Sequence, residues 1–299
     1  MGPNLAEQAA DTQPLVSIGV PVFNEAATVE RAVSCLLAQT YENLEIIISD
    51  NASTDGTAEI AEAIAAADDR VRCVVHQAGL GPAGNFRFVL EEATGEFFMW
   101  AAGDDTWEPP FIEENLRSLV EDEGLVCSTS RVQWIIDGVP SGLAAGTAPL
   151  SGSESRNVAQ YLRVARDNSR FYGLFRRDAL VASFPDQEFL ALDHAVMLGT
   201  LRFGRHGEVG DVLMSRRRNA PESYAQGPDG GAWFPLLPFT RYVVREARIP
   251  LTPVTVGLLV VRNMYEHLRT AALRESLYGR FARQALRLAG PTQRALTTQ

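Results

Sequence analysis

Residues 15–57 decide the fold class, and they read LVSIGVPVFNEAATVERAVSCLLAQTYENLEIIISDNASTDGT. Leu15–Pro21 is a short apolar run suited to a buried strand, and Ala26–Thr40 carries its apolar residues at helical spacing. Asn43–Asp50 (NLEIIISD) predicts a second strand. A strand, a helix and a strand in this order are typical of a parallel sheet that is covered by helices.

The same alternation continues to about residue 103. The sequence predicts two further helices and two further strands, the helices over 55–69 and 81–95 and the strands over 70–76 and 96–103. Ser53 and Asp55 are typical of a helix start, so we expect them to cap the helix that follows. The predicted fold class is α/β, with a mostly parallel central sheet and helices on both faces.

Acidic side chains follow three of these strands. In an open parallel sheet, ligands bind beyond the carboxyl ends of the strands. That rule places three short segments on one rim: Phe23–Glu25, Asp50–Asn51 and Asp104–Asp105. A carboxylate is costly to desolvate unless it is paired or bound to a cation, so this convergence favours a binding site over a set of surface turns.

The alternation loosens after residue 110. We expect a helix over 109–124, a strand and hairpin over 126–138 with Asp137–Gly138 as the turn, and a strand over 207–217. Residues 219–231 are rich in Gly and Pro and predict a mobile segment. The remainder is Arg-rich and predicts helices.

Composition limits the classes of function. The net charge of −10 argues against nucleic-acid binding, which needs clustered excess basic residues. Cys35, Cys73 and Cys127 lie far apart in apolar stretches and predict reduced core thiols, so we expect a cytoplasmic protein. No signal pattern opens the chain, and no apolar run approaches the ~20 residues that span a membrane.

Two long segments carry a family resemblance. One is the stretch quoted above, in which VPVFNEA is followed by SDNASTDGT. The other is GPAGNFRFVLEEATGEFFMWAAGDDTWEPPFIEENL (residues 81–116), with a helix, a Gly-Glu strand, an acidic pair and a following aromatic. In this order and spacing they resemble family 2 glycosyltransferases. The resemblance extends over residues 15–219 and is most specific over 15–116.

The resemblance implies a GT-A (Rossmann-like) fold in a single domain, which transfers a sugar from a nucleotide-diphosphate donor with inversion. The domain would occupy residues 15–219, with a nucleotide-sugar-binding half (15–110) and an acceptor half (111–219). Residues 1–14 are expected to be a disordered tail, and residues 220–299 a mobile loop and a helical C-terminal extension. We expect a UDP- or dTDP-sugar as donor and a glycan, lipid-linked or small-molecule acceptor.

The resemblance also implies a divalent cation, Mg²⁺ or Mn²⁺, because the leaving diphosphate is highly charged and hard cations take carboxylate oxygens. Asp105 is the expected metal ligand, with Asp104 as a second ligand or as a contact to the ribose or the sugar. The family often has an Asp-x-Asp motif. Here Ala102 precedes Gly103–Asp104, so the motif is reduced to the adjacent pair.

Further residues are assigned to the donor by the same resemblance. Asp50 would accept a hydrogen bond from the base edge. Pro21 and Phe23 would flank the base, and Glu25 would line the nucleotide pocket. Asn85 would hold the sugar-phosphate, and Arg216, from the run Arg216–Arg218, would meet the diphosphate. Phe23 stands where the family has tyrosine and keeps the stacking face without the hydroxyl. Helix capping remains the alternative for Asp50, and a favourable helix-dipole contact the alternative for Glu25.

An inverting transfer needs a general base that deprotonates the acceptor hydroxyl. The family takes it from an acidic residue at the start of a later helix, and Asp193 in FLALDHAVMLGTLRFG matches that position. A helix N-cap is the alternative role for Asp193. Glu188 and Asp186 are the other candidates for the base.

Two other classes of protein stay open at this point. Nucleotidyltransferases share the nucleotide-binding half-sheet and acidic metal sites, although no Gly-rich phosphate loop follows Leu15–Pro21. A catalytically degenerate sugar-nucleotide-binding protein is the other class, prompted by Ala102. The Arg-rich C-terminal helices favour a solvated face or a homo-oligomer surface, with peripheral contact at the inner face of a membrane as the alternative.

Overall fold

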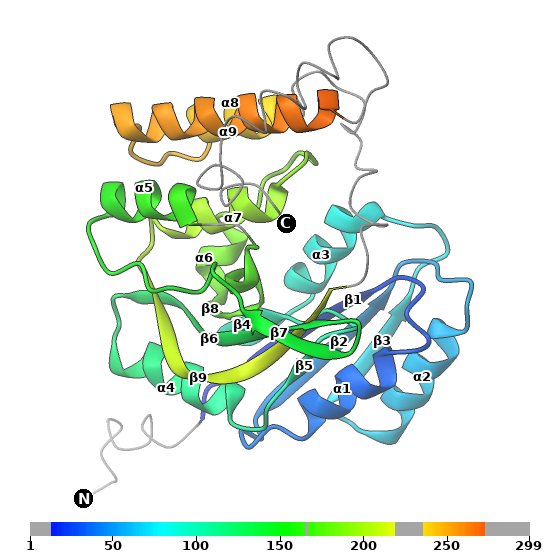
Figure 1. Ribbon diagram of the computed structural model, residues 1–299. Helices are drawn as coiled ribbons and strands as arrows, with labels where there is room; N and C mark the ends of the chain where they lie inside the picture. Colours follow the sequence, from blue (N-terminus) through cyan, green and yellow to red (C-terminus); the bar gives the residue numbers. More distant parts are fainter. Residues whose placement is uncertain (1–12, 165–166, 219–235, 273–299) are drawn as a thin grey trace, which may run out of the picture.

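The computed structural model describes residues 13–164, 167–218 and 236–272. Within these ranges, nine strands form one sheet in the order β3-β2-β1-β4-β8-β6-β9-β5, and β7 pairs with β6 (Figure 1). Helices cover both faces of the sheet, so the predicted α/β class is confirmed.

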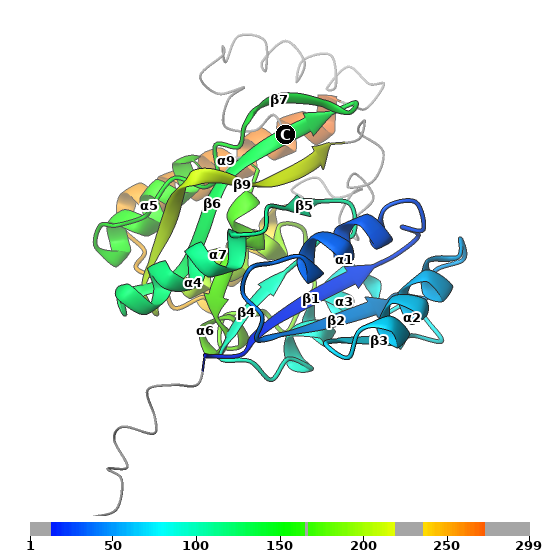
Figure 2. The ribbon, with the colours of Figure 1, turned by 90° about the horizontal axis from the view of Figure 1, so that it is seen from below.

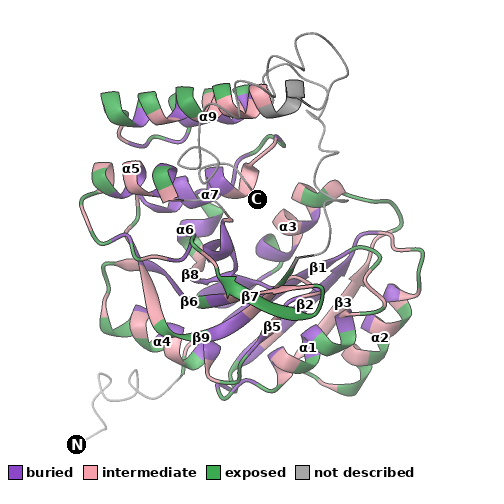
Figure 3. Ribbon diagram, viewed as in Figure 1, coloured by how far each residue is buried: buried purple, intermediate pink, exposed green. Residues whose placement is uncertain are grey.

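The part of the sheet nearest the N terminus is parallel. It contains β1 (Val16–Val22), β2 (Leu44–Asp50), β3 (Val71–Val75) and β4 (Phe97–Trp100), joined by three helices, α1 (Val29–Leu37), α2 (Thr57–Ala67) and α3 (Gly81–Glu91). Helices α1 and α2 lie on one face and α3 on the other (Figure 1). Every residue of β1 is buried, which explains its continuous apolar run (Figure 3).

The rest of the sheet is mixed. Helices connect its strands, and this part of the chain contains, in order, β5 (Thr106–Trp107), α4 (Phe111–Glu121), β6 (Leu125–Ile136), β7 (Val139–Leu143), α5 (Glu154–Val164), the 3₁₀ helix η1 (Ser169–Tyr172), β8 (Leu174–Arg176), α6 (Arg177–Val181) and α7 (Leu192–Thr200). A long last strand, β9 (Arg205–Arg218), pairs parallel with β6 and antiparallel with β5 (Figure 2). Strand β8 is antiparallel to both β4 and β6, so the sheet is parallel throughout only from β3 to β4.

The predicted hairpin is confirmed. Strands β6 and β7 are joined at Asp137 and Gly138, whose φ angles are 51° and 80°. Two successive left-handed residues make the turn whose twist matches that of the strands, and Asp-Gly is a favoured pair for it.

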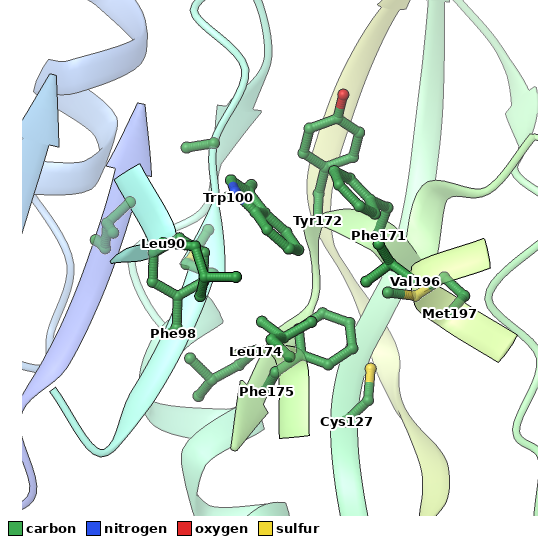
Figure 4. Close-up of a cluster of buried hydrophobic side chains, with 14 of the residues drawn as sticks. Leu90, Phe98, Trp100, Cys127, Phe171, Tyr172, Leu174, Phe175, Val196 and Met197 are labelled. Carbon is green, nitrogen blue, oxygen red and sulfur yellow. The ribbon is translucent and has the colours of Figure 1, made fainter. Parts of the chain in front are cut away.

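An aromatic cluster joins the two parts of the sheet. Trp100 at the end of β4 stacks on Phe171 of η1, with ring centroids 4.3 Å apart and planes 2° from parallel (Figure 4). Phe98 meets Trp100 edge-on, at 5.1 Å between centroids. Since Trp100 precedes the acidic pair by only a few residues, this packing fixes the start of that loop.

Two helices form an outer layer, α8 (Leu237–Arg245) on α7 and α9 (Pro253–Ala272) on α5 (Figure 1). The outward side of α9 exposes apolar residues, namely Val254, Val256, Val260, Val261 and Met264. Across the described helices, none is both long and apolar enough to cross a membrane. The oligomer and membrane interpretations of this region stay predictions.

The sequence makes predictions for the start of α2 and for residues 219–231. Ser53 and Asp55 do not cap α2 from its N-cap position, because Gly56 holds that position with a left-handed φ of 95°. The predicted mobile segment over 219–231 lies outside the described residues, as do residues 1–12 and 273–299.

Candidate functional site

The loops after β1 and β2 are tied together at the rim of the sheet. The hydroxyl of Ser53 accepts a hydrogen bond from the backbone N–H of Asn24 at 2.9 Å, and a carboxylate oxygen of Asp55 accepts one from Ala26 at 3.1 Å. Thr57 accepts in the same way from the N–H of Glu25 at 2.8 Å. Asp55 also accepts from the backbone N–H of Thr57, the first residue of α2, at 3.1 Å, so it serves both the helix start and the neighbouring loop, whereas Ser53 holds the loop.

Backbone strain concentrates in these loops. Six non-glycine residues among those described have a left-handed φ, and four of them lie beside candidate site residues: Asn24, Ala52, Asn168 and Ala191. Such conformations cost on the order of 1–3 kcal/mol each and persist only where the surroundings hold them. Asn24 and Ala52 lie in the loops after β1 and β2, and Asn168 and Ala191 lie beside Asp193.

Asp50 ends β2 and is fully buried. Its Oδ2 accepts a hydrogen bond from the backbone N–H of Ser53 at 3.0 Å. Its Oδ1 is buried without a hydrogen-bond partner in the described part of the protein. A buried acceptor left unpaired costs roughly 1–3 kcal/mol, and a ligand with an N–H group would satisfy it.

Glu25 reaches across the rim toward the acidic pair. Its Oε2 lies directly against the backbone of Gly103, where any side chain would collide with it. This oxygen is also buried without a partner among the described residues. Burial, followed by the charges of Asp104, Asp105 and Asp55, raises the pKa of Glu25 to about 8. The rim thus carries more negative charge than its own basic groups neutralise.

Asp105 is 2% exposed and both of its oxygens are engaged. Oδ2 accepts from Nε of Arg216 at 3.2 Å, and Oδ1 accepts from the backbone N–H of Arg217 at 2.9 Å. Burial raises the pKa of Asp105 to about 7, Asp104 adds to the shift, and Arg216 opposes it. The pKa of Asp104 is also raised by burial, against the pull of nearby arginines.

Arg216 is held by rings as well as by hydrogen bonds. Its guanidinium carbon lies 4.5 Å from the ring centroid of Tyr172 and 5.1 Å from that of Trp134. Its Nη1 donates to the backbone oxygen of Asp167 at 3.2 Å and to the hydroxyl of Ser169 at 3.1 Å. Arg216 thereby connects the acidic pair to the segment that precedes η1.

The acidic residues fit a divalent cation that also binds a diphosphate. In the described part of the chain, no group of three or more His, Cys, Asp or Glu could hold a metal ion. Mg²⁺ in phosphate-transfer sites is commonly bound by one or two carboxylates, with substrate oxygens and waters completing the shell. Each oxygen of Asp105 accepts one hydrogen bond and keeps a second lone pair. With Asp105 and Asp104 as its protein ligands, an ion held here would take the rest of its shell from the diphosphate and water.

The structure separates three other predicted donor residues. Phe23 is 55% exposed on the rim, as a stacking ring should be, and Pro21 lies buried in β1. Asn85 is buried, its Oδ1 accepts from the hydroxyl of Ser49 at 2.5 Å, and its Nδ2 donates to the backbone oxygen of Ser49 at 3.0 Å. Because these bonds pin α3 to β2, we leave Asn85 out of the donor site.

Asp193 lies in the first turn of α7, where Ala191 holds the N-cap position. It is therefore not the cap residue of that helix. Its Oδ2 accepts from Nδ2 of Asn168 at 2.8 Å. Burial opposes ionisation, but the pKa of Asp193 is lowered by His194 when that ring is charged, and by the Asn168 amide, the backbone N–H of His194 and Arg262. At neutral pH, where His194 is uncharged, the last three groups favour the ionised carboxylate.

The two alternative candidates for the base are differently placed. The side chain of Asp186 is 99% exposed and pairs with Arg87 at 3.4 Å. Glu188 is also exposed, and its Oε2 lies near Gly81 at the start of α3. Neither carboxyl group is held by buried hydrogen bonds as Asp193 is.

Sequence reasoning missed Tyr161, Asn168 and Asp167. Tyr161 comes from α5 and contacts His194, beside Asp193. Asn168 and Asp167 come from the segment before η1: Asn168 donates to Asp193, and the backbone oxygen of Asp167 accepts from Arg216. The stretch carries no recognisable motif. A buried asparagine with a left-handed backbone cannot be read from the residue type alone.

The chain is similar in sequence to known proteins. Residues 17–184 match the sequence model described as "Glycosyl transferase family 2". The putative teichuronic acid biosynthesis glycosyltransferase TuaG of Bacillus subtilis (strain 168) is 30% identical over 128 residues, which are 43% of this chain and 51% of that protein. Across the first three curated relatives, the match spans between 33% and 51% of their own length.

Two solved structures are similar over nearly the whole chain. S. aureus TarS 1-349 in complex with UDP-GlcNAc has a TM-score of 0.68 at 14% identity, covering 94% of this chain and 81% of that one. The mannosyltransferase PcManGT from Pyrobaculum calidifontis, in complex with GDP-Man and Mn²⁺, has a TM-score of 0.56 at 18% identity, covering 95% of this chain and 83% of that one. At these identities the likeness establishes the fold.

Proposed function

The chain belongs to glycosyltransferase family 2, whose model matches more than half of it, and we propose that it moves a sugar from a nucleoside diphosphate donor to an acceptor hydroxyl with inversion. One observation carries the proposal. The rim formed by β1, β2 and β4 carries acidic residues, and two buried carboxylate oxygens there, Oε2 of Glu25 and Oδ1 of Asp50, lack hydrogen-bond partners among the described residues. A bound nucleotide sugar would complete this set.

The donor would lie along this rim. Oδ1 of Asp50 would accept from an N–H on the edge of the base, and the exposed ring of Phe23 would stack on its face beside Pro21. Glu25 would line the pocket, and Arg216 would meet the diphosphate through charge-assisted hydrogen bonds. A UDP- or dTDP-sugar is the favoured donor, and the UDP-GlcNAc complex of TarS, a neighbour of the same fold, supports a nucleotide sugar.

A divalent ion, Mg²⁺ or Mn²⁺, would be held by Asp105 with Asp104, and it would neutralise the charge of the leaving diphosphate. The neighbouring carboxyl groups support this: burial is the main cause of the raised pKa values of Glu25 and Asp105, and the charge of Asp104 raises both further. The Mn²⁺ complex of PcManGT, another neighbour of the same fold, agrees with such a site.

Asp193 would be the general base. It would take the proton of the acceptor hydroxyl while the acceptor oxygen attacks the anomeric carbon and the bond to the diphosphate breaks. The lowered pKa of Asp193 keeps its carboxylate ionised for this step. The acceptor would be a glycan, a lipid-linked or a small molecule, and the product a polysaccharide or another glycoconjugate. A cytoplasmic site of action, peripheral to the inner face of a membrane, is part of the proposal.

The domain division belongs to the proposal as well. We assign residues 15–110 to the donor and residues 111–219 to the acceptor, within one domain over 15–219. The residues that surround Asp193 come from the second range, whereas the acidic pair comes from the first. Arg216 is the side chain that connects the two.

The test has two stages. A thermal-shift screen with UDP-, dTDP- and GDP-sugars and Mn²⁺ identifies the donor, and hydrolysis of that donor, with water as acceptor, then reports turnover. Asp193→Asn should bind donor and Mn²⁺ as the parent does, while single-turnover release of nucleoside diphosphate falls by roughly 10²–10⁴-fold. Asp186→Asn, in an exposed carboxyl group, is the matched control and should change nothing.

Three results would count against this assignment. Unimpaired turnover by Asp193→Asn, or a loss explained by weaker donor binding, would pass the role of base to Glu188 or Asp186. Donor binding without any hydrolysis by the parent protein would indicate a degenerate binding protein. Release of sugar 1-phosphate in place of nucleoside diphosphate would indicate nucleotidyl transfer.

A further inference from the structure

A chain of buried hydrogen bonds leads from Asp193 back to its own neighbour in the sequence. Nδ2 of Asn168 donates to Oδ2 of Asp193 at 2.8 Å, and Oδ1 of Asn168 accepts from the hydroxyl of Tyr161 at 2.7 Å. The same hydroxyl lies 2.7 Å from Nδ1 of His194. Tyr161, Asn168 and His194 are all buried, so water does not compete for these bonds.

The direction of every bond in this chain is determined by chemistry. The ionised carboxylate of Asp193 can only accept, so the group of Asn168 that faces it must be the amide NH₂. Oδ1 of Asn168 therefore faces Tyr161, whose hydroxyl must donate to it and in turn accepts from Nδ1–H of His194. Burial lowers the pKa of His194 to about 4, so this ring is neutral at pH 7 and carries its proton on Nδ1. No member of the chain can reverse without losing a bond.

Asn168 is held in a backbone conformation that serves this contact. Its φ of 40° and ψ of 32° lie in the left-handed region, where asparagine is tolerated and most other residues are strained. The adjoining Asp167 anchors the segment, since its carboxylate accepts from the backbone N–H of Ala145 at 2.8 Å and of Ser169 at 3.0 Å. Arg216 adds bonds to Asp167 and Ser169 from the other side.

Two ionisable groups act on the same carboxylate, His194 on α7 and Arg262 on α9. Arg170 and Asp167 act on Tyr161, and Asp167 also acts on His194. The side chain of Asn168 donates a hydrogen bond directly to Oδ2 of Asp193. The amide is therefore the contact that fixes the plane of the carboxylate.

We propose that Asn168, held by Tyr161, is the positioning residue of the general base: its amide binds Oδ2 of Asp193 and so orients the carboxylate toward the acceptor hydroxyl. This inference rests on the proposed role of Asp193. In the reaction, the proton of the acceptor hydroxyl passes to the carboxylate, the acceptor oxygen bonds to the anomeric carbon, and the diphosphate leaves with the electron pair of the broken bond. The hydrogen bond from the Asn168 amide is strong while Asp193 is ionised, and it becomes weaker once Asp193 has taken up the proton.

The left-handed backbone of Asn168 supplies a sharp variant. Asn168→Gly adopts the same φ without strain and removes only the amide, whereas Asn168→Asp is isosteric and places a second carboxyl group against Asp193. For Asn168→Gly we expect kcat of donor hydrolysis to fall at least tenfold, with KM for the donor within twofold of the parent. The acidic limb of the pH profile should move to higher pH, and it should move further in Asn168→Asp.

A second readout needs no substrate. The carboxyl ¹³C signal of Asp193, identified by its absence from Asp193→Asn, should titrate at higher pH in Asn168→Gly than in the parent protein. Tyr161→Phe, which removes only the hydroxyl that holds Asn168, should shift it in the same direction by a smaller amount. Asn157→Ala is the matched control, because Asn157 is a buried asparagine of α5 that bonds to Gly152. It should lose stability and leave the titration of Asp193 unchanged.

The outcomes separate the two levels of the proposal. If Asp193→Asn loses turnover while Asn168→Gly keeps both its kcat and the titration of Asp193, the positioning role is wrong and the base assignment stands. If Asp193→Asn turns over donor at the parent rate, the base assignment fails and the positioning role fails with it. If Asn168→Gly does not fold, Asn168→Asp and Tyr161→Phe carry the same test, and an unshifted titration in both overturns the inference.

Discussion

Arg216 and Asp105 stand 111 positions apart in the sequence, yet Nε of one lies 3.2 Å from Oδ2 of the other. The carboxylate is 2% exposed and the arginine side chain 16%. Two aromatic rings cover the guanidinium, and the backbone N–H of Arg217 binds the second carboxylate oxygen. If either Asp105 or Arg216 is removed, the charge of the other is therefore left buried and cannot become solvated.

Arg216→Ala should therefore lower the stability of the protein as well as its donor affinity. Breaking a buried ion pair from one side costs about 3–5 kcal/mol, because the remaining charge is left unpaired. Asp105→Ala together with Arg216→Ala should be less destabilised than the sum of the two single variants. Urea unfolding of all four proteins measures this coupling. Additive losses would mean that the pair contributes no interaction energy.

Asp105→Asn should abolish the part of donor affinity that depends on Mn²⁺. The amide keeps the shape of the side chain but presents one neutral oxygen, which is a poor ligand for a hard cation. Glu108→Gln is the control, because Glu108 is an exposed acidic residue whose backbone lies away from the site, against Gln39. Calorimetric titration of the donor with Mn²⁺ and with chelator gives the difference. Parent-level turnover by Asp105→Asn with chelator present would refute the metal assignment.

Asp50→Asn should weaken nucleotide binding and leave Mn²⁺ affinity unchanged. The variant can keep its bond to the N–H of Ser53 through the amide oxygen, but it then turns an NH₂ donor toward the base in place of an acceptor. Two facing donors cost roughly 1–3 kcal/mol, which is about tenfold or more in affinity. Titration with the free nucleoside diphosphate measures it. Equal affinity would remove Asp50 from the base contact.

Phe23→Ala tests the stacking surface. Because the ring is 55% exposed, its loss should leave the free energy of unfolding within about 0.5 kcal/mol of the parent. Stacking of a base on an aromatic ring is worth roughly 1–3 kcal/mol, so nucleotide affinity should fall about tenfold. Phe23→Tyr should restore it. A variant that binds nucleotide like the parent would place the base elsewhere on the rim.

His206 gives a prediction for pH. It is 1% exposed, accepts from Nη1 of Arg170 at 3.1 Å and lies 3.0 Å from the hydroxyl of Thr200, and burial lowers its pKa well below 6.5. Below pH 6.5 the unfolded chain gains a proton at this site and the folded protein does not, so this contribution to stability falls as the pH falls. The slope is about 1.4 kcal/mol per pH unit.

His206→Gln should remove that contribution. The difference in unfolding free energy between parent and variant should shrink by about 1.4 kcal/mol between pH 6 and pH 5. Denaturant titrations at each pH give the values. A difference that stays constant over this range would show that His206 takes up a proton in the folded protein.

The parallel half of the sheet was predictable because its signals are local. Strands β1 to β4 are short apolar runs separated by helical periods. The Asp137–Gly138 turn is likewise encoded by two adjacent residues. Where a feature depends on neighbours in sequence, residue type and spacing are enough.

The rest of the site depends on contacts between distant residues. The antiparallel pairing of β5 with β9 sets Thr106 opposite Ser215 and so brings Arg216 to Asp105, and nothing near either residue in the sequence specifies that pairing. Asp55 binds the first N–H of α2 as its residue type predicts, but Asp55 and Ser53 also bind the loop after β1, a contact between distant residues that residue type does not predict. The expected sugar-phosphate contact of Asn85 meets the same limit, since Ser49 on the neighbouring strand takes its amide.

One guanidinium binds both the acidic pair and the segment that carries Asn168. Thermodynamic reciprocity then applies: whatever a donor does to Arg216 it also does to the loop beside the base, and an acceptor acts back on the donor to the same extent. The consequence is coupled binding, in which the donor changes acceptor affinity by the same factor as the acceptor changes donor affinity. Titration of nucleoside diphosphate with and without acceptor would measure this factor, and Arg216→Lys, which loses the fork of donors, should bring it toward one.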